Sequence, residues 1–305
     1  MNCPLPIITH ETKSEFTVKY DELKSFIDYF ASGKNFAILI NFGSISQGKS
    51  TFSQHISGFK HAIGNDLAAE TLGAQISYCG TIQDIINKFN IKEEITSNTN
   101  IHVFNIDTEG ILYDENVTKF LLPLIQTSTL LIGYTESFTD LSLVPLLSDI
   151  YRISKINILI TVKNSHSIIR DEINSISEYM RRAKLSDLSK KLINENIRST
   201  IIPCVDFRDD VQHQFSKIMN NYFISRALNL MSDNQWNDSS TFINQLKNLY
   251  SIQNNDFIHS IFTRDSPSDS ILRIISNDCY TMINNLSENC KDASFYDNLI
   301  LQITE

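Results

Sequence analysis

The sequence predicts an α/β fold in which helices cover a mostly parallel sheet, with a C-terminal part made of helices. Short, nearly continuous apolar runs are typical of strands buried on both faces. These runs alternate with segments of helical periodicity, and such alternation favours right-handed crossovers and parallel strands. From about residue 209 the strand patterns end and only helical patterns follow.

The composition fits a folded protein of one large or two modest domains. Of 305 residues 42% are hydrophobic, which is enough to bury a substantial core. The formal net charge of -9 gives no broad cationic surface, so nucleic acid is not expected as a partner. Five scattered cysteines without a C-x-x-C pair favour free thiols in a reducing compartment. Neither a signal peptide pattern nor an apolar stretch of about 18 residues is visible, so we expect a cytoplasmic location and no membrane span.

The expected elements follow in chain order. Apolar side chains at helical spacing predict a first helix over residues 21–32, which Gly33 ends. Apolar runs predict strands at 35–42, 101–106, 129–132, 156–162 and 200–202. Helical periodicity predicts further helices at 82–89, 141–151, 173–193, 215–230, 242–250 and 271–286. The polar stretch 233–240 predicts a loop.

The segment after the first predicted strand carries the motif Gly43-x-x-x-x-Gly48-Lys49-Ser50. A strand before it and a helix after it are the context that a P-loop requires. In a P-loop, backbone N–H groups surround a β-phosphate at the positive end of a helix dipole. Lys49 would bridge the β- and γ-phosphates, and the Ser50 hydroxyl would bind Mg²⁺. The predicted nucleotide contacts of this segment also include Ser46, Gln47 and Thr51.

A second acidic group is expected at the end of a neighbouring strand, where a P-loop protein holds its magnesium. The strand predicted at 101–106 leads into Asp107, and Glu109 and Gly110 follow closely. We expect Asp107 to hold Mg²⁺ directly or through water, Gly110 to donate its N–H to the γ-phosphate, and Glu109 to lie at the nucleotide. Taken alone, this segment is ordinary turn chemistry, and the P-loop is what favours the functional interpretation.

Asp107-Thr-Glu-Gly110 resembles the corresponding motif of dynamin-superfamily large GTPases: guanylate-binding proteins, atlastins, the root-hair-defective type and the very large interferon-inducible GTPases. Glu70-Thr71-Leu-Gly73 is similar to the switch I segment of that group. The resemblance implies that Thr71 closes over the nucleotide, with its hydroxyl on Mg²⁺ and its backbone on the γ-phosphate. Without it, Thr71 is a threonine in a loop before a strand. Lys49, Thr71 and Gly110 would then be the catalytic residues.

The resemblance covers about residues 16–257, specifically at two motifs and loosely elsewhere. It implies a Ras-like large G domain of the P-loop NTPase class at residues 1–257. Residues 258–305 would then be a helical extension, the start of a stalk or middle domain. The segment 241–250 is similar to a helix late in the family's G domain.

Ser46 departs from the pattern of the resembling families. Guanylate-binding proteins and atlastins have an Arg at this place that acts as an internal arginine finger, whereas the root-hair-defective type also shows Gly-Ser-x-Ser before its Gly-Lys-Ser. An arginine finger contributes about 10³ to 10⁵ in rate. We therefore expect slow hydrolysis unless a partner supplies the charge.

The base-reading segment departs as well. The family places Arg-Asp at the end of a strand to read guanine, whereas the strand predicted at 156–162 is followed by Lys163-Asn164. An amide offers one acceptor and one donor where guanine presents two donors, so weaker base discrimination is expected. Arg170-Asp171 is either a displaced reader or the solvated first turn of a helix. Cys204 belongs to a loop that packs near the base in the resembling families.

By this resemblance the chain is a GTP-binding protein with GTP or GDP and Mg²⁺ as cofactors, slow hydrolysis, and nucleotide-dependent homodimerisation through the nucleotide face. A membrane role would require a partner protein or further chain after residue 305. Two alternatives stay open. A nucleotide-binding interaction module with little or no turnover is favoured by Ser46 and Asn164. A P-loop ATPase or kinase is disfavoured by Thr71 with its Gly73 and by the absence of an Arg-rich lid.

The histidines show no metal-binding pattern. None has a cysteine partner at metal-ligand spacing, so each is expected to be a surface or core histidine: His55, His61, His102 and His166.

Overall fold

The computed structural model describes residues 3–12, 15–44, 47–61, 73–108, 115–162, 176–203, 214–231 and 235–253. The chain divides into two units, Met1–Tyr250 and Ser251–Glu305. The second unit is described only as far as residue 253. The predicted boundary at residue 257, the predicted helix at 271–286 and the proposed extension at 258–305 lie outside the described residues.

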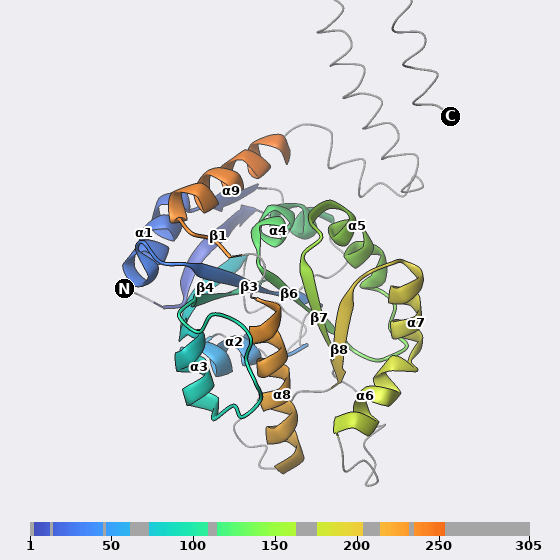
Figure 1. Ribbon diagram of the computed structural model, residues 1–305. Helices are drawn as coiled ribbons and strands as arrows, with labels where there is room; N and C mark the ends of the chain where they lie inside the picture. Colours follow the sequence, from blue (N-terminus) through green and yellow to red (C-terminus); the bar gives the residue numbers. More distant parts are fainter. Residues whose placement is uncertain are drawn as a thin grey trace, which may run out of the picture. The chain divides into compact units, whose positions relative to one another are not determined.

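Eight strands of the described residues form one sheet at the centre of the first unit (Figure 1). The strands β5, β3, β6, β7 and β8 run parallel to one another, whereas the pairs β2–β1, β1–β4 and β4–β5 are antiparallel. This confirms the predicted class, a mostly parallel α/β fold. In sheet order the strands are β2 (Glu15–Val18), β1 (Leu5–Thr12), β4 (Ala74–Thr81), β5 (His102–Thr108), β3 (Phe36–Gly43), β6 (Leu130–Thr135), β7 (Asn157–Val162) and β8 (Ser199–Pro203).

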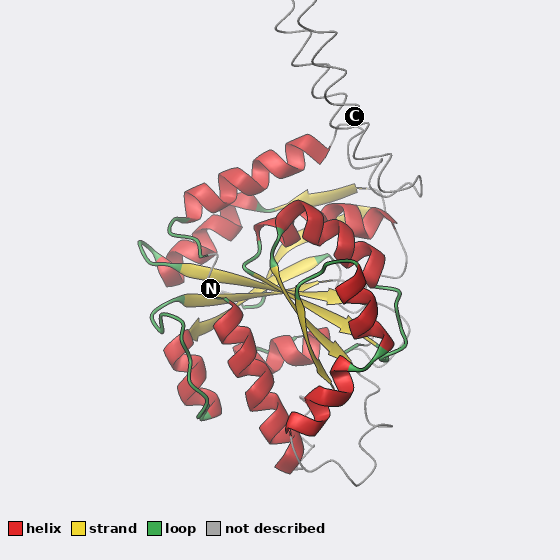
Figure 2. Ribbon diagram, turned by 45° about the vertical axis from the view of Figure 1, so that its right-hand side comes forward, coloured by secondary structure: helices red, strands yellow, loops and turns green. Residues whose placement is uncertain are grey.

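Helices cover both faces of this sheet (Figure 2), which explains why β3, β5 and β6 are buried along their whole length. A strand covered on both sides has no polar face, so its sequence reads as a continuous apolar run. The helices are α1 (Tyr20–Ala31), α2 (Lys49–Ser57), α3 (Ile82–Phe89), α4 (Glu115–Thr127), α5 (Val144–Ser154), α6 (Ile176–Lys184), α7 (Asp187–Asn194), α8 (Gln214–Leu230) and α9 (Ser239–Gln253).

Alternate residues of β3 belong to the cores on opposite faces of the sheet, as the two-residue period of a strand requires. On one face, Phe36 packs edge-on against Phe104 of β5 and Phe242 of α9, with ring centroids 5.8 and 5.9 Å apart. On the other face, Leu39 belongs to the apolar cluster that includes α2 and α8. In that cluster Phe52 and Phe223 are in edge contact at 5.5 Å. The helix after the P-loop is thereby fixed to the sheet.

The structure adds elements that the sequence patterns did not predict. The strands β1, β2 and β4 and the helix α4 were missed, and β4 has partly exposed residues that break its apolar pattern. The single helix predicted at 173–193 is wrong, because two helices separate at Ser186, whose side chain accepts from the N–H of Ser189 and caps α7. A capping serine inside a periodic stretch starts a new helix.

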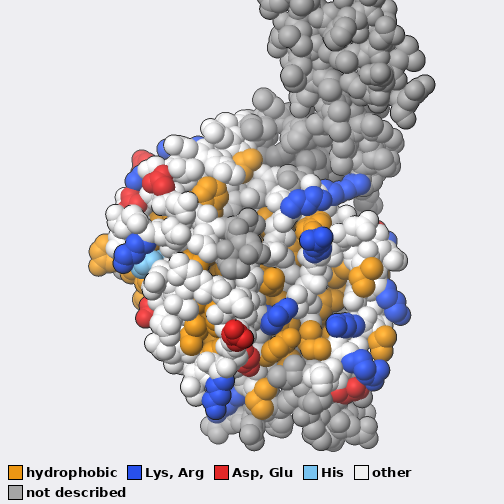
Figure 3. Space-filling view, in the orientation of Figure 1, with side chains coloured by type: hydrophobic (Ala, Val, Ile, Leu, Met, Phe, Trp, Pro, Cys, Tyr) orange, Lys and Arg blue, Asp and Glu red, His pale blue; other side chains and the backbone are white. Residues whose placement is uncertain are grey.

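Charged side chains on the helices α6 and α7 take part in ion pairs. Lys and Arg side chains are visible over the right-hand side of the molecule in Figure 3. Arg181 pairs with Glu178 at 2.8 Å within α6, and Lys191 of α7 pairs at 2.9 Å with Glu195, the residue that caps the end of α7. Exposed pairs of this spacing stabilise a helix only weakly.

In the described part of the chain, no helix combines the length and the apolar character that crossing a bilayer would require.

The single tryptophan of the sequence joins the start of β3 to the segment before α9, inside the stretch predicted as a loop. The backbones of Trp236 and Phe36 exchange two hydrogen bonds of 2.9 Å. The indole N–H donates to the carbonyl of Thr127 at 2.9 Å, and the ring packs against Phe242 with centroids 5.2 Å apart.

We therefore expect Trp236→Phe to destabilise the fold by about 1 kcal/mol, because it removes one hydrogen bond and keeps an aromatic ring. Trp236→Ala should cost about 3 kcal/mol, because the ring contact is lost as well. Urea unfolding followed by circular dichroism measures both. Equal losses in the two variants would show that the ring contact contributes nothing.

Candidate functional site

Two glycines delimit the predicted P-loop between β3 and α2. Gly43 ends β3 with φ of +151°, and a Cβ at this position would lie 2.6 Å from the carbonyl oxygen of Tyr134 in β6. Gly48 precedes α2 in the left-handed region, with φ of +91°. Any other residue at Gly43 would require backbone movement, and a side chain at Gly48 would be strained. The chain can turn from strand to helix here because both positions are glycine.

Lys49 is the first residue of α2, and its side chain is folded into the loop. The residue is only 5% exposed. Its ammonium donates to the carbonyl oxygens of Gly43 at 3.0 Å and Ser44 at 2.7 Å. A buried ammonium requires such acceptors. The positive charge therefore lies within the turn that the P-loop interpretation assigns to the phosphates.

Asp107 lies near the carboxyl end of β5, the strand beside β3. The two strands are parallel, with Ile40 of β3 level with Ile106 of β5. Asp107 is thus one residue further along than this pair, at the edge of the sheet where the P-loop begins. Its side chain is completely buried. The fold therefore places Asp107 near the end of the strand beside β3, where the sequence analysis expects an acidic residue.

A buried polar network lies behind the P-loop and connects β3 to α2, β5 and β6. The amide nitrogen of Asn41 donates to Ser53 Oγ at 3.1 Å and to Asn105 Oδ1 at 2.7 Å. The hydroxyl of Tyr134 donates to Asn41 Oδ1 at 3.0 Å. Burial, and the nearby carboxylate of Asp107, raise the pKa of Tyr134 well above its ordinary value, so this hydroxyl remains a donor.

Sequence reasoning missed this network, although a signal was available. Asn41 and Asn105 each interrupt an otherwise apolar strand run. A polar residue inside such a run must find a partner, and adjacent strands offer the nearest one.

His61 is a buried histidine, as one of the two alternatives for it supposed, but its contacts were not foreseen. It is 3% exposed. Its backbone N–H donates to Gln54 Oε1 of α2 at 3.3 Å, and its Nε2 lies 2.9 Å from Ser77 Oγ of β4. Its Nδ1 lies 3.6 Å from Asp107 Oδ2. Only the tertiary fold brings these residues together.

Some of the predicted site residues are among those that the structure describes. Near the carboxyl ends of the parallel strands β3 and β5, or in the segment that follows β3, lie Gly43, Gln47, Gly48, Lys49, Ser50, Thr51 and Asp107. Other predicted contacts lie outside the described residues: Ser46, Thr71, Glu109, Gly110, Lys163, Asn164, Arg170-Asp171 and Cys204. The assignments to switch I and to base reading therefore stay predictions.

The donor set fits a magnesium ion that is shared with a nucleotide. Within the described ranges no group of three or more His, Cys, Asp or Glu is arranged to hold a metal ion. Mg²⁺ in nucleotide sites is commonly bound through one or two protein oxygen ligands together with the substrate's phosphates. Ser50, in the first turn of α2, and the carboxylate of Asp107 would be those protein ligands.

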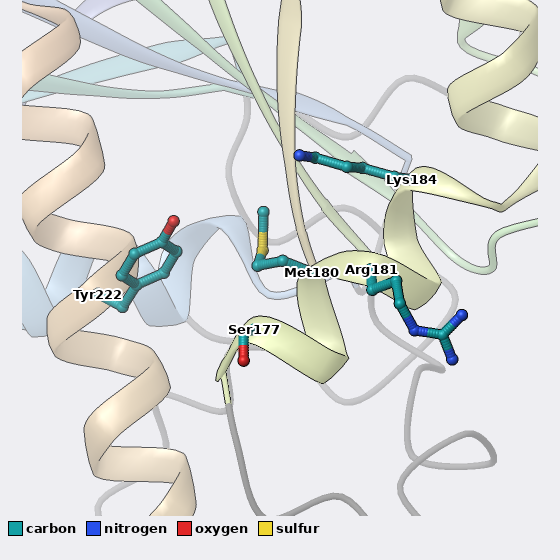
Figure 4. Close-up of a pocket in the computed structure, with 5 residues that line it drawn as sticks. All are labelled: Ser177, Met180, Arg181, Lys184 and Tyr222. Atoms are coloured by element: carbon teal, nitrogen blue, oxygen red, sulfur yellow. The ribbon is translucent and has the colours of Figure 1, made fainter.

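A separate hollow of about 530 Å³ lies between α6 and α8, lined by Ser177, Met180, Arg181, Lys184 and Tyr222 (Figure 4). In the close-up, Arg181 points away from Tyr222. Among the residues that the structure describes, none of those predicted to contact the nucleotide lines this hollow.

Together, the parallel sheet, the glycine turn into α2 and the neighbouring strand that carries Asp107 define the architecture. The chain has an α/β P-loop fold. Comparison with protein-family models and with curated proteins gives no match.

Two solved structures to which the chain is similar are elongation factors. Translation elongation factor SelB from Methanococcus maripaludis, in complex with the GTP analogue GppNHp, has 15% sequence identity and a TM-score of 0.35 over 63% of this chain and 34% of that chain. A bacterial selenocysteine-specific elongation factor, EF-Sec, has 14% identity and a TM-score of 0.35 over 55% of this chain and 25% of that chain. The chain thus spans about a third or less of each. Because the similarity is this low, the fold class rests on the described structure itself.

The network around Asn41 makes a thermodynamic prediction. Asn41→Ala should cost about 3 kcal/mol, because it leaves several buried polar groups without a partner. Tyr134→Phe should cost about 1–2 kcal/mol, because it removes one donor. The double variant should lose less than the sum of the two, since both act on one hydrogen bond. Urea unfolding of the four proteins measures the coupling, and strictly additive losses would contradict the network.

Proposed function

We propose that this chain is a magnesium-dependent P-loop protein that binds GTP and GDP. The observation that carries the proposal is the position of the Lys49 ammonium. It lies inside a glycine turn at the start of a helix, and the buried carboxylate of Asp107 lies near the carboxyl end of the adjacent parallel strand. A cation held over a helix N-terminus next to a carboxylate that can bind a metal suits the phosphates of a nucleotide.

Lys49 has a clear role in this proposal. In the described structure its ammonium donates to two uncharged carbonyl oxygens. Phosphate oxygens would replace them with charged acceptors, and hydrogen bonds between charged groups are roughly twice as strong as those between neutral groups. The exchange would therefore favour binding without any new burial of the lysine.

Ser50 and Asp107 would hold the metal. Bound Mg²⁺ would neutralise part of the phosphate charge. The protein's own contribution is to hold the Asp107 carboxylate at the end of β5. The fixed parallel register of β3 and β5 sets its position relative to the P-loop. Thr71 and Gly110 would complete the phosphate contacts, on the resemblance of their motifs to dynamin-superfamily GTPases.

The finer proposal is a large GTPase of the dynamin superfamily, of the guanylate-binding protein, atlastin or root-hair-defective type. It is supported by Asp107-Thr-Glu-Gly110 and by Glu70-Thr71-Leu-Gly73. It includes a G domain at residues 1–257 with a helical extension at 258–305, a cytoplasmic location, and a homodimer through the nucleotide face. A membrane-associated or other protein partner belongs to the same proposal.

Ser46 favours a second candidate, a nucleotide-dependent interaction module with little or no turnover. The segment lacks the arginine that would stabilise the transition state from within the chain. A measurement of phosphate release distinguishes a slow GTPase from a module that does not hydrolyse GTP. A P-loop ATPase or kinase differs from both in its choice of base.

Isothermal titration with GTP, GDP, ATP and XTP, each with Mg²⁺ and with EDTA, tests the binding proposal. We expect GTP and GDP to bind more tightly than ATP, and EDTA to weaken binding. Lys49→Ala should weaken binding by about 10- to 100-fold, the loss of one charged hydrogen-bonding group. Thermal melting of this variant serves as the control for folding. Tighter binding of ATP than of GTP would overturn the GTPase proposal.

Phosphate release, followed beside Lys49→Ala as background, separates the enzyme from the interaction module. We expect slow turnover of GTP by the wild-type protein, because Ser46 supplies no charge to the transition state. Turnover no faster than that of Lys49→Ala would favour the interaction module.

Light scattering after gel filtration, with GDP and with a non-hydrolysable GTP analogue, tests the dimer. A mass that does not change between the two nucleotides would contradict the dimerisation switch.

A further inference from the structure

We infer that His61 is a positioning residue for Asp107, and that it orients the carboxylate which would bind Mg²⁺. This inference deepens the proposed function and rests on it. It assigns a role to a histidine that lies far from Asp107 along the chain and belongs to no motif.

His61 is held from two directions before it reaches Asp107. Its backbone N–H is bonded to Gln54, within the same helix that begins with Lys49. Its Nε2 is bonded to Ser77 of β4, the strand beside β5. The side chain is completely buried, so the ring cannot turn outward to water. These contacts leave Nδ1 directed at the carboxylate.

Nδ1 of His61 is buried and has no hydrogen-bond partner. The nearest acceptor described for it is Asp107 Oδ2 at 3.6 Å, slightly beyond the range of about 2.7–3.2 Å for an N–H···O bond. A buried polar nitrogen without a partner is costly. A small movement of the carboxylate, such as one that accompanies metal binding, would satisfy it.

The contact between Ser77 Oγ and Nε2 of His61 permits the tautomer that the inference uses. When the Ser77 hydroxyl donates to Nε2, the ring proton lies on Nδ1 and faces Asp107. In this tautomer the ring directs an N–H toward the carboxylate of Asp107.

Partners of this kind are common around metal ligands. A group that hydrogen-bonds to a ligating carboxylate fixes its orientation, and loss of such a partner typically costs about 10- to 100-fold in metal affinity. A purely structural histidine, satisfied by Ser77 alone, would have no such effect. The structural contact with Ser77 uses Nε2, whereas the positioning of Asp107 uses Nδ1. Substitutions that replace only one of these nitrogens can therefore separate the two roles.

Two substitutions distinguish the nitrogens. In His61→Asn the side-chain amide can take the place of Nδ1, and in His61→Gln it can take the place of Nε2. His61→Asn therefore retains the contact toward Asp107, whereas His61→Gln retains the contact toward Ser77. His61→Ala removes both.

The readout is the affinity for a fluorescent GDP analogue, measured in EDTA and across a Mg²⁺ titration. We expect His61→Ala and His61→Gln to raise the half-saturating Mg²⁺ concentration by about 10- to 100-fold, and His61→Asn to stay within about threefold of the wild type. The affinity in EDTA should be equal in all four proteins. An equal affinity in EDTA and an equal melting temperature of the nucleotide-free proteins show that each variant is folded.

A double-variant cycle assigns the effect to Asp107. In the Asp107→Asn background, His61→Ala should cause no further change in Mg²⁺ dependence, because its target is gone. An unchanged Mg²⁺ dependence in His61→Ala would overturn the inference alone. The inference would also be overturned if the half-saturating Mg²⁺ concentration were normal in His61→Gln and raised in His61→Asn. Wild-type protein without Mg²⁺-dependent GDP binding would overturn the proposed function, and the inference with it.

Discussion

The side-chain amide of Asn41 is the contact on which the geometry of the P-loop region depends. An amide buried among apolar strands is costly unless its groups are hydrogen-bonded. Asn41 is bonded to Ser53 in α2, to Asn105 in β5 and to Tyr134 in β6. Each bond fixes a different neighbour of β3. A shift of the strand or of the helix would leave polar groups unpaired, so one arrangement is strongly favoured.

The network and the glycine turn share a residue, Tyr134. Its hydroxyl bonds to Asn41, while its carbonyl lies where a Cβ on residue 43 would have to be. The close approach of β6 to the end of β3 therefore requires Gly43, and the same approach brings the hydroxyl to the amide. The turn into α2 and the polar network therefore both depend on the position of Tyr134 beside the end of β3.

The two charged groups of the candidate site have contacts with different parts of the chain. Lys49 is compensated locally, by carbonyl oxygens of the loop that precedes it. Asp107 is completely buried and faces His61, which comes from beyond the far end of α2. The position of the carboxylate is thereby linked to the packing of α2 and β4 around His61.

The sequence by itself determined the fold class, the central strands and the position of the P-loop. Continuous apolar runs and the glycine motif are local patterns, and burial on both faces of the sheet imposes them directly. The same patterns gave no sign of β1, β2 and β4, which pair antiparallel at one side of the sheet, because partly exposed strands lack a continuous apolar run.

Only the tertiary structure decided how polar side chains meet. Asn41 and Asn105 are visible as interruptions of apolar runs, but their pairing depends on strand order, which no local pattern encodes. His61 has no motif at all, and it meets Asp107 because α2 and β4 converge on β5. Hydrogen bonds between residues far apart in the chain follow from the packing of whole elements. The sequence therefore indicated which chemistry to expect, and the fold decided which side chains support it.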